Sequence, residues 1–393
     1  MSRPLLQTIQ RAGLAVRTAW LLLGLTLLLL AALEIGLRGV FALKDRVAGP
    51  TIPDPRVVRD GYAGETWPIQ HYRELEALAE RWEPSVYFRQ RPFAGETINI
   101  DDLGRRAVWR PPDAAPPDSR PVKILMLGGS ALWGYGARDD QTIPSLLARS
   151  LHERGVAAEI HNLSEIGYVN TQELVTLARE LQAGYRPDVV LFHDGVNGTT
   201  SALLAGEPTL TTNEVNRERE FNLLQPPGRL TAALIDRSVA DSALQRLARS
   251  IGRRVFGAPN TAPPGIAAVD LAAMARGVVD GYRANIAMID ALAESYGFRP
   301  LYIWQPVVFT KVRPTPFERE ERVKYAWTAP AFAEVARAIA AATDLQGRSD
   351  FVDLSGLFDD EEGLIFIDYC HTTEAGNARL AEAILPRLLE LSR

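Results

Sequence analysis

Four short motifs occur in one order along the chain, at residues 128–130, at Gly167, at residues 195–197 and at residues 368–371, and the first and third directly follow runs that suit buried strands. Residues 128–130, Gly-Gly-Ser, end the run that starts at Lys123, residues 195–197, Gly-Val-Asn, follow a second run, and residues 368–371, Asp-Tyr-Cys-His, precede a periodic segment. Short apolar runs with few polar breaks are typical of parallel strands covered on both faces. Because open parallel sheets build their sites at the carboxyl ends of the strands, the motifs predict an α/β fold whose polar turns meet at one edge.

Strand-like and helix-like segments alternate from Val122 to the C-terminus. Such alternation predicts a parallel sheet with helices on both faces, which is a three-layer α/β/α domain. The predicted strands are Lys123–Leu127, Ala158–Leu163, Asp188–His193, Leu301–Trp304 and Phe351–Leu354, and the predicted helices are Thr142–Arg154, Asn170–Gln182, Leu271–Tyr296, Ala329–Ala342 and Thr373–Ser392.

The N-terminus has a different character. Thr18–Leu37 is a run of 20 residues with a single charge, Glu34, and it follows Arg3, Arg11 and Arg17 with no acid before it. This length suffices to cross the hydrocarbon core as a helix, and the basic flank favours a cytoplasmic N-terminus. The run is long for a signal peptide and no clean cleavage site follows, so we predict an uncleaved anchor rather than a cleaved signal or a buried core helix.

A charged Glu34 side chain inside a membrane costs free energy, so we expect the carboxylate to reach the interface or to be protonated. The alternative is a contact between Glu34 and another membrane protein. Prolines at 50, 53, 55 and 68 indicate a linker over residues 44–80, with a short helix near Arg73–Arg81. The predicted organisation is a cytoplasmic segment 1–17, a transmembrane anchor 18–40, a linker and N-terminal extension 41–120, and an α/β domain 121–393 with an insertion at about 199–265.

Composition excludes several classes of function. The net charge is −5, so nothing marks a nucleic-acid surface. The one cysteine, Cys370, cannot form an intrachain disulfide, and no Cys/His cluster has zinc spacing. We therefore expect no metal and no cofactor.

The motifs supply the groups needed for acyl transfer through a serine ester. Ser130 is the candidate nucleophile, because a turn after a strand exposes its hydroxyl. His371 is the candidate general base, and Asp368 would accept from the imidazole and fix its tautomer. The alternative is a glycine-rich capping turn with a surface histidine, which the joint presence of the motifs disfavours.

The order and spacing of these motifs resemble the SGNH (GDSL-like) hydrolase family over roughly the last two thirds of the chain. Residues 371–377 are similar to the family's last block, and residues 162–168 are similar to its second block. Gly129 stands where the family signature has aspartate, and Gly198 stands where aspartate is common. The resemblance implies a flavodoxin-like sheet, a serine nucleophile and no cofactor.

The resemblance also implies an oxyanion hole made of the backbone N–H groups of Ser130 and Gly167 and the side-chain amide of Asn197. Trp133 and Tyr135 follow the nucleophile and are candidates for the substrate pocket, whereas His193 and Asp194 are interpreted as supporting or structural residues. Asn197 also begins a glycosylation sequon, which is discounted because its loop should face the site.

These features predict a serine esterase or O-acyltransferase that is anchored by a single span in the cell inner membrane, with its catalytic domain in the periplasm. The expected substrate is an acyl ester such as an acetylated glycan or exopolysaccharide. The alternatives are a lysophospholipase or thioesterase acting on lipids, or a non-catalytic glycan-binding scaffold of the envelope. Expected partners are the lipid bilayer and another membrane protein of an envelope acylation system, and no nucleic acid.

Overall fold

The computed structural model places most of the chain in two compact units. The smaller combines Met1–Thr51 with Glu218–Asn260, and the larger combines Ile52–Arg217 with Thr261–Arg393. The residues that the structure describes are 3–47, 62, 64–112, 120–211, 214–224, 242–245, 247 and 268–392.

The smaller unit is built on one long helix, α1 (Arg3–Val47). Its segment Val16–Lys44 has a mean hydropathy of 2.2, and its large apolar side chains are exposed rather than packed into a core. This confirms an N-terminal helix that is long and apolar enough to span a membrane. The helix continues past Leu37, the predicted end of the apolar run, to Val47, although Gly36 and Gly39 flank that position.

Glu34 contacts the chain's own insertion. Its carboxylate accepts a hydrogen bond from Arg38 Nε at 2.9 Å and from the backbone N–H groups of Ala243 at 2.7 Å and Leu244 at 3.1 Å. These donors satisfy a carboxylate that an apolar helix would otherwise leave costly. A contact with a second membrane protein stays a prediction. Most of the basic segment Leu244–Arg254 lies outside the described residues.

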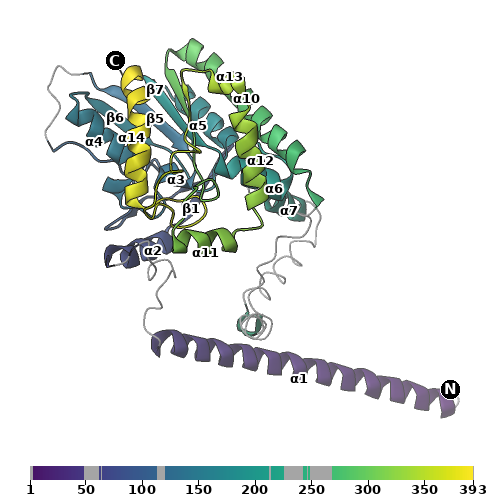
Figure 1. The fold of residues 1–393 in the computed structure, drawn as a ribbon. Helices are drawn as coiled ribbons and strands as arrows, with labels where there is room; N and C mark the ends of the chain where they lie inside the picture. The colour runs from purple at the N-terminus through teal and green to yellow at the C-terminus, as the bar shows by residue number, and fades with distance from the viewer. Residues whose placement is uncertain are drawn as a thin grey trace. The chain divides into compact units, whose positions relative to one another are not determined.

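A five-stranded parallel sheet forms the centre of the larger unit (Figure 1). The first strand in the sequence lies second in the sheet, and the next strand in the sequence lies beside it at one edge. The remaining three strands follow in sequence order on the other side of the first strand, up to the opposite edge. This is the flavodoxin-like order, and it creates a switch point between β5 and β7. The strands in spatial order are β6 (Ala158–Asn162), β5 (Val122–Gly128), β7 (Val189–Asp194), β8 (Arg299–Trp304) and β9 (Phe351–Asp353).

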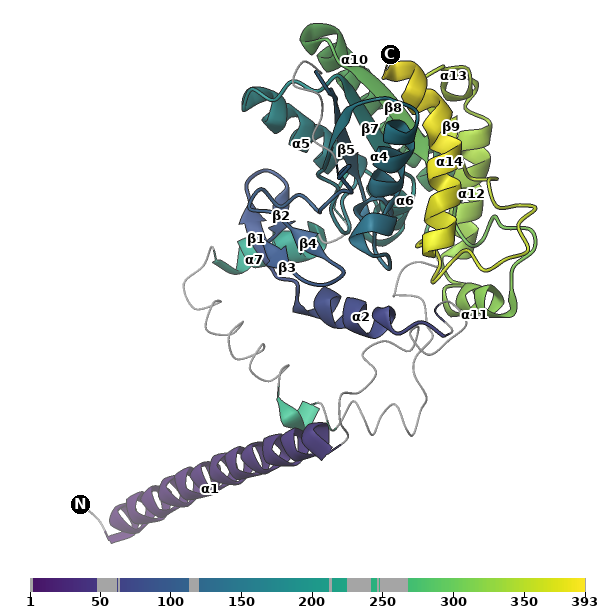
Figure 2. The ribbon, with the colours of Figure 1, turned by 90° about the vertical axis from the view of Figure 1, so that its left-hand side faces the viewer.

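Helices cover both faces of this sheet, which confirms the predicted three layers, and Figure 2 shows α4 and α14 side by side on one of them. Alternate strand residues feed the two cores: Leu125 and Phe192 face one, and Ile124 and Leu191 face the other. One face carries α5 (Asn170–Gln182), α6 (Val196–Ala205), α10 (Leu271–Tyr296) and α12 (Ala329–Ala340), and the other carries α4 (Ile143–Glu153) and α14 (Glu374–Leu391). The shorter elements are α3 (Ser130–Trp133), η3 (Asp139–Gln141), α7 (Glu214–Leu224), α11 (Pro316–Lys324) and α13 (Thr343–Gln346).

The stretch predicted as a linker is folded onto the larger unit from Tyr62 onward, and we call residues 62–110 the N-terminal extension. The expected helix near Arg73–Arg81 lies earlier, because Pro68 sits in its first turn, where a missing N–H costs nothing, and Leu78 is already extended. The extension's elements are α2 (Trp67–Ala77), the antiparallel pair β1 (Glu80–Glu83) and β2 (Tyr87–Gln90), and the pair β3 (Phe93–Ala94) and β4 (Asn99–Ile100).

The predicted insertion at 199–265 begins inside regular structure. Its first residues belong to α6, and α7 follows after a turn. Most of residues 225–267 lie outside the described residues. A role for this segment over the site therefore stays a prediction.

Candidate active site

Ser130 lies at the carboxyl end of β5, on the side of the sheet's switch point. It is the first residue of α3, with Gly129 as the residue before the helix, so its backbone N–H has no acceptor within the helix. Gly134 ends α3 at φ 101°, a conformation that glycine adopts without strain. The sharp turn on each side of α3 leaves the Ser130 hydroxyl half-buried and facing the loop after β9.

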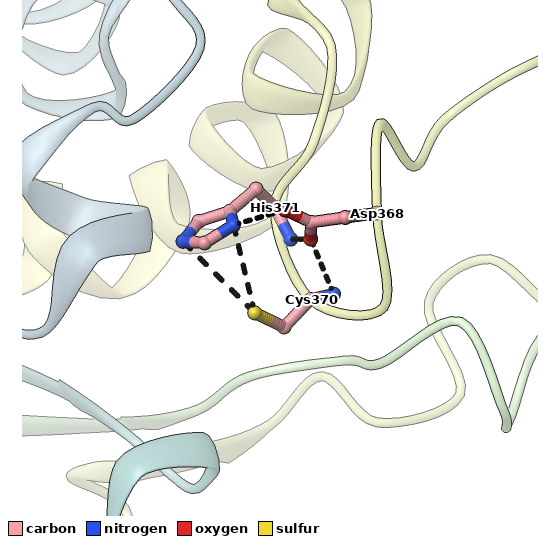
Figure 3. A group of neighbouring side chains, drawn as sticks. All are labelled: Asp368, Cys370 and His371. Carbon is pink, nitrogen blue, oxygen red and sulfur yellow. Dashed lines mark hydrogen bonds and ion pairs between the residues drawn. The ribbon is translucent and has the colours of Figure 1, made fainter. Parts of the chain in front are cut away.

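His371 and Asp368 complete a line of hydrogen bonds to this serine. His371 Nε2 lies 2.6 Å from Ser130 Oγ, and His371 Nδ1 lies 2.7 Å from Asp368 Oδ2. Asp368 is buried, and its second oxygen accepts the backbone N–H groups of Cys370 and His371 at 2.9 and 2.8 Å. Figure 3 shows the carboxylate and the imidazole on one loop, pointing toward each other. The carboxylate is thus held rigidly for the imidazole.

The loop that carries these two residues is anchored by a buried ion pair. Glu318 Oε1 accepts the backbone N–H groups of Ile365 and Phe366, each at 3.0 Å, and Lys311 Nζ lies 2.7 Å from Glu318 Oε2. Burial raises the pKa of Glu318, but the Lys311 hydrogen bond and the backbone donors outweigh it and hold that pKa below its usual value. The segment of the loop that leads to His371 is therefore held in place by the charged Glu318 carboxylate, both of whose oxygens accept hydrogen bonds.

Cys370 lies beside the imidazole, with its Sγ 3.7 Å from His371 Nδ1 (Figure 3). Asp368, Cys370 and His371 each offer one atom that could ligate a metal, all within 4.8 Å of one another. Both ring nitrogens of His371 are engaged, however, one with Asp368 and one with Ser130. The geometry suits a proton relay better than a metal site.

Asn197 follows β7, on the other side of the switch point. Its Nδ2 donates to the carbonyl of Tyr168 at 2.7 Å, which leaves a second amide hydrogen for another acceptor. A Cβ placed on Gly129 would approach Asn197 Nδ2 to 2.3 Å, so the amide lies directly against the nucleophile turn. Gly167, at φ 86°, precedes the tyrosine that holds this amide. The predicted donors thus lie on the turns after β5, β6 and β7.

Two buried carboxyl groups lie behind the Asn197 turn. Asp194 ends β7 and accepts from Asn170 Nδ2 at 2.8 Å, and Glu173 of α5 is buried next to it. Burial raises the pKa of Asp194, and burial together with the Asp194 charge raises that of Glu173. His193 is also buried, and burial lowers its pKa to about 4, so its imidazole is neutral. Asn170 of α5 thus holds the Asp194 carboxylate directly before the turn that carries Asn197.

The two aromatic pocket candidates have different surroundings. Trp133 is 0% exposed and packs against Ile98, so the prediction that it lines the substrate pocket is wrong. Tyr135 is half-buried, and its ring stacks on His371 with a centroid distance of 4.3 Å. Of the two side chains, only that of Tyr135 faces the site.

Arg106 is a supporting residue that the sequence did not reveal. Its guanidinium is fully buried and donates to the carbonyls of Trp133 at 3.2 Å, Gly134 at 2.5 Å and Ala137 at 2.6 Å, and to Asp139 Oδ1 at 2.9 Å. Nothing in a single arginine after a turn signals such a role, because most of its partners are backbone carbonyls. It fixes the loop that follows the nucleophile.

Other residues of the N-terminal extension hold the same loops. Tyr62 donates to the carbonyl of Gly136 at 2.7 Å, and the backbone N–H of Gln90 donates to Glu165 Oε2 at 2.9 Å. Glu165 belongs to the turn that carries Gly167. The extension therefore touches the turns after β5 and β6, but contributes no group to the Ser-His-Asp line.

A serine, a histidine and an aspartate joined by hydrogen bonds at the carboxyl edge of a parallel sheet have the geometry of a serine-hydrolase triad. No family model and no curated protein matches the chain. Among solved structures it is similar to an acetyl xylan esterase (12% identity, 67% of this chain and 98% of the other, TM-score 0.35) and to a putative GDSL-like lipase from Parabacteroides merdae (12%, 69% and 94%, 0.37). It is also similar to an acetylxylan esterase from Geobacillus stearothermophilus (14%, 68% and 93%, 0.33). At these identities and TM-scores the matches decide nothing about chemistry, which rests on the residues of this chain.

Proposed function

We propose that this chain is a serine enzyme that acts on ester bonds through an acyl group carried on Ser130. The observation that supports it most is the unbroken line from Ser130 Oγ through His371 to Asp368, with distances of 2.6 and 2.7 Å. A serine hydroxyl is a poor nucleophile without such a base. The closeness of the Asn197 amide to the turn that carries Ser130 supports a role for it as an oxyanion donor.

The proposed reaction has two halves. Ser130 Oγ attacks the ester carbonyl while His371 Nε2 takes its proton, and Asp368 stabilises the resulting imidazolium. The Ser130 N–H, the Gly167 N–H and the Asn197 amide then bind the oxyanion. Collapse breaks the ester C–O bond, and His371 returns the proton to the departing alcohol. In an esterase, water then attacks the acyl-serine through the same steps and releases the acid. In an O-acyltransferase, a sugar hydroxyl attacks the acyl-serine instead and leaves as the new ester.

The proposed setting is the outer side of the inner membrane, with α1 as a single-pass anchor. Three arginines precede the apolar run and favour an N-terminus in the cytoplasm, which would put the larger unit in the periplasm. Alkaline phosphatase and a cytoplasm-active reporter, each fused after the C-terminal residue, distinguish the two orientations. Activity of the cytoplasmic reporter alone would contradict this proposal.

The enzymatic proposal is tested on the purified full chain in detergent. We expect a fluorophosphonate probe to label the wild-type protein but not Ser130→Ala, and a panel of p-nitrophenyl esters from acetyl to palmitoyl to be turned over with a chain-length preference. A preference for the longest acyl groups would favour the lipid-hydrolase alternative. Absence of both labelling and turnover in a folded protein would favour a non-catalytic scaffold.

A further inference from the structure

A cavity of about 420 Å³ opens beside the candidate active site. Its volume lies within the range of ligand pockets, roughly 300–1,000 Å³. Tyr135, whose ring stacks on His371, forms one wall, and Ile166, the neighbour of Gly167, forms another. The remaining lining residues are Leu75, Leu78, Glu80 and Gln90, all from the N-terminal extension.

The apolar walls of this cavity are fixed by packing. Leu75, Leu78, Tyr135 and Ile166 are partly buried against one cluster that includes the fully buried Trp133. Side chains packed on one side cannot collapse into the space on the other without losing these contacts. The cavity is therefore part of the fold of the extension against the catalytic turns.

Its polar lining includes an unsatisfied group. Gln90 is only 4% exposed, and its side-chain Oε1 is buried without a hydrogen-bond partner among the residues that the structure describes. A buried amide oxygen without a partner costs free energy that a ligand hydroxyl can recover. Glu80, on the exposed strand β1, adds a carboxylate that accepts hydrogen bonds.

We propose that this cavity binds the alcohol part of the ester, and that this alcohol is a hydroxylated ring such as a sugar unit. The proposal rests on the enzymatic function proposed above. The Tyr135 ring and the two leucines offer an apolar surface to the sugar ring, while the Gln90 amide oxygen and the Glu80 carboxylate accept hydrogen bonds from its hydroxyl groups. The N-terminal extension thus selects the substrate that the triad cleaves.

An alkyl chain is a poorer occupant of the same space. It would cover the Gln90 amide without satisfying it and would bring hydrocarbon against the Glu80 carboxylate. A site built to hydrogen-bond hydroxyl groups rejects an analogue that lacks them, because its polar groups are then left unpaired. The cavity should therefore distinguish two acetate esters of primary alcohols, one with a hydroxylated ring and one with an alkyl chain.

The test compares a methyl glucoside acetylated at its primary hydroxyl with hexyl acetate. Both release acetate from a primary alcohol, so the ratio of their kcat/KM values reports recognition of the alcohol alone. We expect Gln90→Leu and Glu80→Gln each to lower this glucoside-to-hexyl ratio by about tenfold or more. The matched control is Glu76→Gln, an exposed carboxylate of α2 outside the cavity lining, which should leave the ratio at the wild-type value.

An unchanged ratio in both variants would overturn the proposal, as would a wild-type preference for hexyl acetate over the acetylated glucoside. If Gln90→Leu damages the fold, both esters slow together, and Glu80→Gln, at an exposed position, then decides. Failure of the enzymatic function gives a different result: the wild-type protein would then hydrolyse neither ester nor p-nitrophenyl acetate, and it would not react with a fluorophosphonate.

Discussion

The catalytic turns and the N-terminal extension serve one site in different ways. The turns after β5, β6 and β7 and the loop before α14 carry every group that would act on the ester bond that is cleaved, and a glycine at positive φ follows each of the three strands. The extension carries none of these groups, yet Arg106, Tyr62 and Gln90 reach the same turns from outside the sheet. Chemistry and the rigidity that positions it therefore come from separate parts of the chain.

This division predicts that substitutions in the two regions have different signatures. Changes at the catalytic turns should remove activity while the free energy of unfolding stays near the wild-type value. Changes at buried residues of the extension that hold these turns, such as Arg106, should lower stability and activity together.

Ser130→Ala and His371→Ala should each lower ester turnover by several orders of magnitude, and the double variant should cost little more. Residues that act as one unit are strongly non-additive. Steady-state kinetics on p-nitrophenyl acetate measure the loss, and chemical denaturation checks that the fold is intact. Near-normal turnover by a folded Ser130→Ala protein would rule out this residue as the nucleophile.

Arg106→Leu should destabilise the larger unit by about 3–5 kcal/mol, the cost of breaking a buried ion pair and leaving its partner uncompensated. Here Asp139 and several backbone carbonyls would lose their donor. Urea denaturation measures the change, and Arg73→Leu, at an exposed position of α2, is the matched control. If Arg106→Leu unfolded at the wild-type urea concentration, the extension would not hold the nucleophile loop.

Asn197→Ala should lower kcat about a hundredfold with little change in KM, which is the effect of one lost oxyanion donor. The amide would bind an oxygen that carries full charge only in the transition state. Its loss should therefore weaken binding of the transition state more than binding of the substrate. Michaelis–Menten kinetics separate the two constants. A change confined to KM would place Asn197 in ground-state binding instead.

Glu165→Gln should alter the pH dependence of stability. Burial raises the pKa of Glu165 to about 7, against the opposing Arg89 charge and the Gln90 N–H. The folded state therefore holds this proton more tightly than the unfolded state, and stability should fall as pH rises from about 4.5 to about 7. A glutamine at position 165 can still accept the hydrogen bond from the backbone N–H of Gln90, but it cannot ionise.

The variant should consequently be about 1–3 kcal/mol more stable than the wild-type protein at pH 8 and no more stable than it at pH 4.5. Urea denaturation at both pH values measures this difference. Glu76→Gln, at an exposed position, should show no such pH dependence. Equal stability of Glu165→Gln and wild type at pH 8 would mean that this turn contains no buried acid of raised pKa.

Much of the fold could be predicted because local pattern and tertiary position agree. The strand that ends at Gly128 is a short apolar run, and the helix Asn170–Gln182 has a regular apolar stripe whose residues pack on the sheet as expected. Ser130, His371 and Asp368 were predictable for a related reason. The proposed reaction requires those residue types, at strand ends that the sheet brings together.

The extension could not be predicted in the same way. Arg106 acts on backbone carbonyls, which have no sequence signature, and α2 is too polar overall for its burial to be visible as a periodic stripe. Trp133 was misassigned because an aromatic residue close to a nucleophile suits a pocket and a core equally well. In the structure the Trp133 side chain lies on the inner side of α3 and is part of the hydrophobic core.

The proposed function depends on an acyl group that is carried on Ser130. The most direct measurement is rapid acid quenching of the full chain during turnover of p-nitrophenyl acetate, followed by peptide mass spectrometry. Our account predicts an acetylated peptide in which Ser130 is the modified residue, absent from Ser130→Ala and lost when turnover is complete. Turnover with an unmodified Ser130, or with acetyl on another residue, would contradict it.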